Sequence, residues 1–91
     1  MDDKAIASKI VEGMPYQCRI ETSTEYSVTI PESLHLHHSR LYANCAELSR
    51  REDISGVSVS HYNHRGNCVY TIEVAQNYEI DDGDDSNNWG L

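Results

Sequence analysis

Hydrophobic and polar residues alternate most regularly across residues 54–75, in two runs joined by residues 63–66. Alternation with a period of two is typical of a strand with one buried face, and Gly66 ends the link with a residue that readily adopts positive φ. We therefore predict an antiparallel hairpin with a four-residue turn. Its expected cross-strand pairs are Tyr62–Asn67, His61–Cys68, Val59–Tyr70 and Val57–Ile72. In this register one face holds every large apolar side chain except Val69, which predicts that this face is buried.

Two shorter alternating runs, residues 16–21 and 26–30, flank a short polar link. Two such runs around a polar link indicate a second antiparallel hairpin. Pro31 follows the second run and is expected to end it, because proline has no N–H to donate to a ladder. One face of the first run is expected to carry Tyr16, Cys18 and Ile20.

The first twelve residues have the pattern of a short amphipathic helix. Ile6 and Ile10 fall on one face, as residues four positions apart in a helix do. Asp2 and Asp3 are suitable N-terminal caps, and their charge suits the positive end of the helix dipole. Gly13 is typical of the position just beyond a helix C-terminus.

A second helix is predicted over residues 39–52, with Arg50 and Arg51 in the last turn, where positive charge is favoured. Residues 32–38 fit either the first turns of this helix or a loop. They alternate as a strand does, yet they also continue the apolar stripe of the helix. That stripe consists of Leu34, His38, Leu41, Cys45 and Leu48.

The predicted elements follow one another in the order helix, strand, strand, helix, strand, strand. This order predicts an α+β fold, a small two-layer sandwich of αββ-αββ order. A four-stranded antiparallel sheet is expected to carry both helices on one face. We expect one domain over residues 1–78 and an acidic, disordered tail over residues 79–91, whose composition offers little apolar surface to bury. The uncovered sheet face is expected to be polar, with Gln17, Arg19, Glu21, Ser27, Thr29, Ser58, Ser60, Thr71 and Glu73.

The 91-residue chain has a formal net charge of −8, and the charge is unevenly distributed. Residues 1–78 carry ten acidic and all seven basic side chains, so the other five acidic side chains lie in the tail. Direct binding to nucleic acid is not expected, because phosphate binding requires clustered lysines and arginines. No apolar segment approaches the length that spans a bilayer, and three widely spaced cysteines are typical of a reducing compartment. We therefore expect a cytoplasmic protein with no membrane partner.

Five histidines and three cysteines suggest a metal site or a catalytic centre. His61, His64 and Cys68 surround the predicted turn and are the donor types that zinc prefers. Their spacing matches no zinc-binding motif, and the cysteines equally suit small buried side chains. His61 and Cys68 are also the only nucleophile and base that the pattern brings together. We therefore expect no cofactor, metal or catalytic residue, and keep a zinc-binding or histidine-based hydrolytic domain as an alternative.

The acidic tail ends close to a tryptophan, a combination that suits docking on a basic protein surface. In size, charge and strand–helix order across residues 1–78, the chain resembles the small acidic inhibitors that phages and mobile elements use against host defence, including anti-CRISPR and DNA-mimic proteins. The resemblance implies a non-enzymatic binding module whose partner is the basic surface of another protein, such as a nucleic-acid-binding complex. The expected partner-binding residues are Glu21, Glu25, Glu52, Asp53, Glu73, Glu79, Asp81, Asp82, Asp84, Asp85 and Trp89. A homo-oligomeric structural module, such as a homodimer, is the other alternative.

Overall fold

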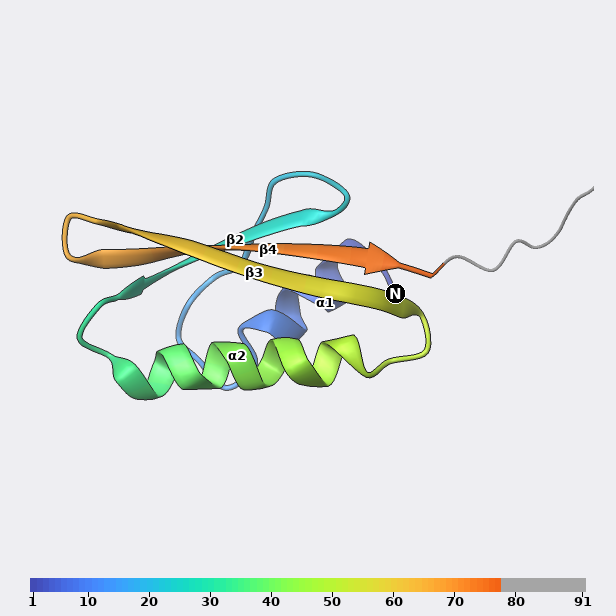
Figure 1. Ribbon diagram of the computed structural model, residues 1–91, viewed down its shortest axis with the longest axis horizontal. Coiled ribbons are helices and arrows are strands. Elements are labelled where there is room, and N and C mark those ends of the chain that lie inside the picture. The colour runs from blue at the N-terminus through green and yellow to red at the C-terminus, as the bar shows by residue number, and fades with distance from the viewer. Residues whose placement is uncertain (78–91) are drawn as a thin grey trace, which may run out of the picture.

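Two helices and four strands follow one another in the predicted order, and the computed structural model describes residues 1–77. The elements are α1 (Asp3–Ile10), β1 (Arg19–Ile20), β2 (Glu25–Pro31), α2 (His35–Ser49), β3 (Ile54–His64) and β4 (Asn67–Gln76). All strand pairs are antiparallel, and both helices lie on one side of the sheet (Figure 1). The predicted α+β sandwich of αββ-αββ order is therefore confirmed. The expected tail, residues 79–91, lies outside the described residues.

The strands are arranged in the order β1-β2-β4-β3. β4 lies between β2 and β3, so its pairing with β2 joins the two halves of the chain. The two edges of the sheet differ greatly, because β1 has only two residues and β3 has eleven. The long edge therefore belongs to β3.

The hydrophobic core fills the space between the sheet and the two helices. α1 contributes Ile6 and Ile10, and α2 contributes Leu41, Cys45 and Leu48, all of them at most 3% exposed. Their spacing places each set on one face of its helix, as predicted. The strands add the buried side chains Tyr26, Val28, Ile30, Ile54, Cys68, Tyr70, Ile72 and Val74. Full burial of one such large side chain stabilises the fold by about 1.5–3 kcal/mol.

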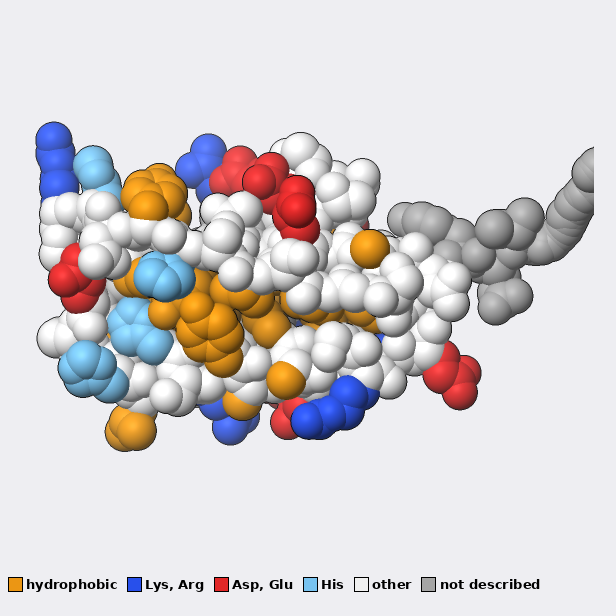
Figure 2. All heavy atoms as spheres, in the orientation of Figure 1, with side chains coloured by type: hydrophobic (Ala, Val, Ile, Leu, Met, Phe, Trp, Pro, Cys, Tyr) orange, Lys and Arg blue, Asp and Glu red, His pale blue; other side chains and the backbone are white. Residues whose placement is uncertain are grey.

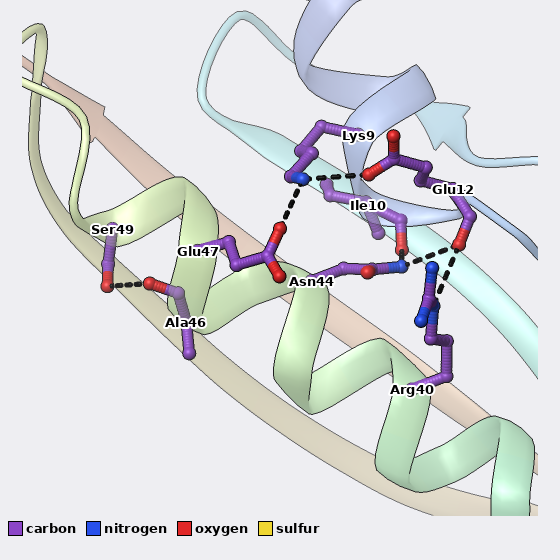
Figure 3. Close-up of polar contacts among 8 residues, drawn as sticks. All are labelled: Lys9, Ile10, Glu12, Arg40, Asn44, Ala46, Glu47 and Ser49. Atoms are coloured by element: carbon purple, nitrogen blue, oxygen red, sulfur yellow. Dashed lines mark hydrogen bonds and ion pairs between the residues drawn. The ribbon is translucent and has the colours of Figure 1, made fainter.

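Asn44 is buried and polar, and it joins the two helices (Figure 3). Its Nδ2 donates hydrogen bonds to the carbonyl oxygens of Ile10 at 3.1 Å and Glu12 at 3.0 Å. These carbonyls lie at the C-terminal end of α1, where the helix itself supplies no further N–H groups. At the surface, the ammonium of Lys9 forms ion pairs with Glu12 and Glu47 and so links the same helices. Asn44 thus fixes the end of α1 against α2.

The central hairpin forms, but the predicted register is wrong by two residues. His64 pairs with Asn67, so the turn contains only Arg65 and Gly66. Both have positive φ, 53° and 81°, as a type I′ turn requires. The observed pairs include Tyr62–Val69, His61–Tyr70, Val59–Ile72 and Val57–Val74. A shift of two leaves each side chain on its original face, so the prediction of the buried face on β4 still holds.

The first hairpin is shorter than predicted, because β1 contains only Arg19 and Ile20. The residues before β1 turn toward α2, where the Tyr16 hydroxyl lies 2.7 Å from Nδ1 of His37. Residues 16–18 therefore form no pairs with β2. Ile20 is 41% exposed, so the predicted apolar face of this run is not fully buried.

The helix boundaries also differ from the prediction. α2 begins at His35, so the ambiguous segment 32–38 is partly turn and partly the first turn of the helix. It ends at Ser49, and Arg50 is its C-cap residue. The prediction that Arg50 and Arg51 lie in the last helical turn is therefore wrong. In α1, Oδ1 of Asp2 accepts a hydrogen bond from the Ala5 amide at 2.8 Å, which confirms the expected cap. α1 ends at Ile10, two residues earlier than expected.

Candidate functional site

The sheet face opposite the helices is concave and polar. A hollow of about 880 Å³ lies on this outer face, with lining residues from all four strands and from the segment before β1. Ser27, Thr29 and Thr71 contribute hydroxyl groups to it, and Glu21 and Glu25 contribute carboxylates. Figure 2 shows acidic side chains gathered on the side of the sheet away from α2. The sheet face that the sequence analysis predicted to be polar and uncovered by helices therefore carries a hollow with acidic side chains in its lining.

Glu25 of β2 and Glu73 of β4 are directly opposite one another in the sheet. The Val74 amide donates to the Thr24 carbonyl at 2.8 Å, so the neighbouring pair 25–73 is one of the closely spaced, non-hydrogen-bonded pairs. Cβ atoms in such a pair are about 4.5–5.5 Å apart, and like charges there destabilise the sheet by roughly 0.2–1 kcal/mol. Within residues 1–77 neither carboxylate forms an ion pair or a hydrogen bond.

Glu21 belongs to the same acidic group but has local partners. Its Oε2 lies 3.2 Å from Nε of Arg19 and accepts a hydrogen bond from the Ser27 hydroxyl at 2.9 Å. Arg19 offsets one of the three carboxylates, so the group formed by Glu21, Glu25 and Glu73 keeps a net negative charge. We call these three residues the acidic triad.

Tyr62 provides the aromatic component of the outer face. It is 59% exposed, it lines the hollow, and it pairs across the strands with Val69. The sequence analysis placed every large apolar side chain of the hairpin except Val69 on the buried face. This prediction was wrong for Tyr62, which lies on the outer face. The alternation could have shown the position of Tyr62. Every second residue of a strand lies on the same face, and Tyr62 follows the polar residues Ser58 and Ser60 in this series. A large exposed ring that lines the same hollow as carboxylates is typical of an anchor in a protein interface.

The other predicted acids do not join this group. Glu52 and Asp53 lie in the turn between α2 and β3. Oδ2 of Asp53 lies 3.0 Å from the N-terminal ammonium of Met1, and this hydrogen bond holds the pKa of Asp53 below its usual value. Arg51 lies 3.7 Å from the other carboxylate oxygen, so the charge of Asp53 is compensated locally. The remaining predicted contacts, Glu79, Asp81, Asp82, Asp84, Asp85 and Trp89, lie outside the described residues.

The alternative zinc site does not assemble in the described part of the chain. In the observed register His61 faces Tyr70 and Cys68 faces Asn63, so His61 and Cys68 are not the cross-strand neighbours that were predicted. His64 lies beside the turn, opposite Asn67. Across residues 1–77, no three His, Cys, Asp or Glu side chains are placed so that they could hold a metal ion.

His38 takes part in a structural chain of hydrogen bonds. Its Nε2 lies 2.9 Å from the carbonyl oxygen of Pro31, which can only accept, so Nε2 carries the proton. Nδ1 is then the acceptor for the Tyr70 hydroxyl at 2.5 Å. Burial is the main cause that raises the pKa of Tyr70, so this hydroxyl remains a donor at neutral pH. The arrangement ties α2 to β4 and uses both ring nitrogens of His38.

Two thiols are poorly suited to nucleophilic chemistry. Burial raises the pKa of Cys45 to about 11 and is the main cause that raises the pKa of Cys18 to about 12. The thiolate is the reactive form of cysteine, so both groups are almost entirely unreactive thiols at neutral pH.

No protein-family model matches the sequence, and no characterised protein or solved structure is significantly similar to the chain. None of the helices in residues 1–77 has the length and apolar character needed to cross a membrane.

Proposed function

We propose that this protein is a non-enzymatic binding module whose outer sheet face docks on a basic surface of another protein. The observation that carries the proposal is the facing pair Glu25 and Glu73. Two carboxylates directly opposite one another, without a cation between them, cost the free protein stability. Lysine or arginine side chains from a partner would remove this repulsion and gain attraction, so the same pair that weakens the free fold favours the complex.

The shape and composition of the outer face support this proposal. The hollow is broad and polar, and Tyr62 offers an exposed ring on its β3 side. An aromatic anchor that becomes desolvated can supply much of the affinity, while the surrounding charges steer association and select the partner. The raised pKa values of Cys45 and Cys18 keep both thiols protonated at neutral pH, so these two residues do not favour nucleophilic catalysis over binding.

We further propose that the partner is a nucleic-acid-binding protein, as in the inhibitors of host defence that the chain resembles. Surfaces that bind phosphates are rich in lysine and arginine, and an acidic face competes for such a surface. The acidic residues of the tail and Trp89 would extend the same contact, with charge again providing the attraction.

The proposal is tested with an oligolysine peptide as the probe and the full-length chain as the receptor. The double variant Glu25→Gln/Glu73→Gln removes the facing charges. The control Glu12→Gln/Glu47→Gln makes the same change in net charge at exposed positions off the outer face, and it removes only their surface ion pairs with Lys9. Because both variants keep the tail, any difference between them reports on the sheet face.

Exposed ion pairs are worth about 0.2–1 kcal/mol each, so loss of two predicts a dissociation constant about 2–30-fold higher for the outer-face variant than for the control. The difference should shrink as salt is added, because salt screens exposed charges. Equal affinities for the two variants at low salt would show that the outer face does not take part in binding.

A further inference from the structure

Among residues 1–77, no strand pairs with the outer edge of β3. β3 is the last strand of the sheet and has eleven residues, none of them Asp, Glu, Lys, Arg or Pro. Sheets usually protect such an edge with charges, prolines, bulges or short strands. The only irregularity in the β3–β4 ladder lies between Ile54 and Gly56, at the start of the strand. The central part of β3 therefore lacks these protective features.

The register identifies which backbone groups point outward. A two-residue turn makes His64 and Asn67 a hydrogen-bonded pair, so hydrogen-bonded and open pairs alternate from there along the ladder. The residues whose N–H and C=O groups point away from β4 are Val57, Val59, His61 and Asn63. Within the described chain no other segment bonds to these groups. They form a row of free donors and acceptors in the spacing that another strand requires.

Below this edge lies a partly apolar slot between β3 and α2. Figure 2 shows hydrophobic side chains exposed between the two elements, with histidines near one end. Val57 and Val59 are only partly buried there, and Tyr42 of α2 is 44% exposed. At the turn end of β3 lies a hollow of about 280 Å³ whose lining includes Glu32, His38 and Tyr70. An added strand could place every second side chain in this slot.

We propose that β3 binds an extended segment of the partner as a fifth strand, and that this segment alternates apolar and basic residues. This inference rests on the proposed function and specifies its mode of recognition. The apolar residues would enter the slot below Val57 and Val59. The basic residues would lie on the outer side, where the small Ser58 separates the β3 edge from Glu73. A long lysine or arginine side chain can extend over this serine toward Glu73, the member of the acidic triad nearest the β3 edge.

A second copy of this chain is a poorer occupant of the edge. Each copy has a net charge of −8, so two copies repel one another, whereas a basic segment is attracted. A second β3 strand would also bring no lysine or arginine toward Glu73.

The first test follows amide hydrogen exchange in the full-length protein with a peptide of alternating lysine and valine. At a peptide concentration about ten times the dissociation constant, exchange at Val57, Val59, His61 and Asn63 should slow by about tenfold. The amide of Ser60 already bonds to β4 and should change little. A peptide of the same sequence with N-methyl groups on the amides that face β3 should bind more weakly and give no such protection.

The second test alters the edge itself. His61→Pro removes an outward N–H that the fold does not use, a position where an edge strand tolerates proline. His61→Ala removes the same side chain and keeps the N–H. The proline variant should bind the alternating peptide about 2–10-fold more weakly than the alanine variant, which corresponds to one main-chain hydrogen bond. The N-methylated peptide makes the same test on the unaltered protein, independently of how His61→Pro folds.

The outcomes separate this inference from the proposed function. Slowed exchange along β3 that N-methylation abolishes supports both. Binding that is sensitive to Glu25→Gln/Glu73→Gln but indifferent to N-methylation, without slowed exchange, overturns strand addition and leaves the proposed function intact. Failure of every lysine peptide to bind overturns both. A dimer of the protein alone that already protects the β3 amides would assign the edge to a second copy and overturn the inference.

Discussion

Replacement of the buried Asn44 by leucine is expected to remove a large part of the stability of this domain. Asn44 is 2% exposed, and its amide donates to the carbonyl oxygens of Ile10 and Glu12. Leucine fills a similar volume but donates nothing, so the end of α1 loses two hydrogen bonds. A buried carbonyl left without a partner costs about 1–3 kcal/mol. Because Nε of Arg40 also donates to the Glu12 carbonyl at 3.3 Å, we expect a total loss of about 2–4 kcal/mol.

This loss is large beside the total stability of such a domain, roughly 4–12 kcal/mol at about 0.05–0.15 kcal/mol per residue. Urea unfolding followed by circular dichroism measures it directly, and the melting temperature should fall by about 8–30 °C. Arg40→Met is the matched control, since it removes the exposed donor to the same Glu12 carbonyl and should cost less than about 1 kcal/mol. If Asn44→Leu unfolds within about 0.5 kcal/mol of the unaltered protein, the helix end does not depend on this side chain, and the reasoning is wrong.

Three further predictions concern the backbone, the acidic triad and a buried thiol. Gly13 has φ of +79° and an added Cβ would lie 2.9 Å from the Arg40 guanidinium, so Gly13→Ala should cost about 1–2 kcal/mol in urea unfolding, whereas Gly56→Ala, with nothing within 4 Å, should cost clearly less. A double-mutant cycle of Glu25→Gln and Glu73→Gln should give a repulsive coupling of about 0.2–1 kcal/mol that falls with added salt, and an attractive or zero coupling at low salt would contradict the proposed repulsion. Burial raises the pKa of the Cys45 thiol from its ordinary value of 9.0, which holds in the unfolded chain, to about 11 in the folded protein. This difference does not change the free energy of unfolding below pH 9, where the thiol is protonated in both states. Above pH 9 the unfolded state loses its proton first, so the free energy of unfolding should fall by on the order of 2 kcal/mol as the pH approaches 11, and the Cys45→Ala variant should lack this component.

The sequence was sufficient to predict the order of elements and most of the core, because burial imposes periods that a single chain displays. Ile6 and Ile10 on α1, and Leu41, Cys45 and Leu48 on α2, follow the helical period and are buried. The register of the central hairpin was harder to predict from the sequence. Two registers that differ by two residues keep the same faces, so alternation could not distinguish them, and the choice depends on the positive φ of Arg65 and Gly66.

The candidate site was predictable only in part. Glu21, Glu25 and Glu73 were expected on an open polar face, but their convergence depends on the pairing of β2 with β4, which are far apart in the sequence and not joined by a turn. Local pattern contains no information on that pairing, because it arises from the packing of the whole sheet. The same pairing leaves β3 at the edge, so the open strand could not be inferred from the hairpin alone.

Mapping of the oligolysine peptide onto the isotope-labelled, full-length protein by NMR titration tests the central claim most directly. The account predicts the largest chemical-shift changes at Glu25, Glu73, Tyr62 and their neighbours on the outer face, weakened by added salt and by Glu25→Gln/Glu73→Gln. Shift changes confined to the helix layer or to residues beyond 77, with the outer face unaffected, would contradict it.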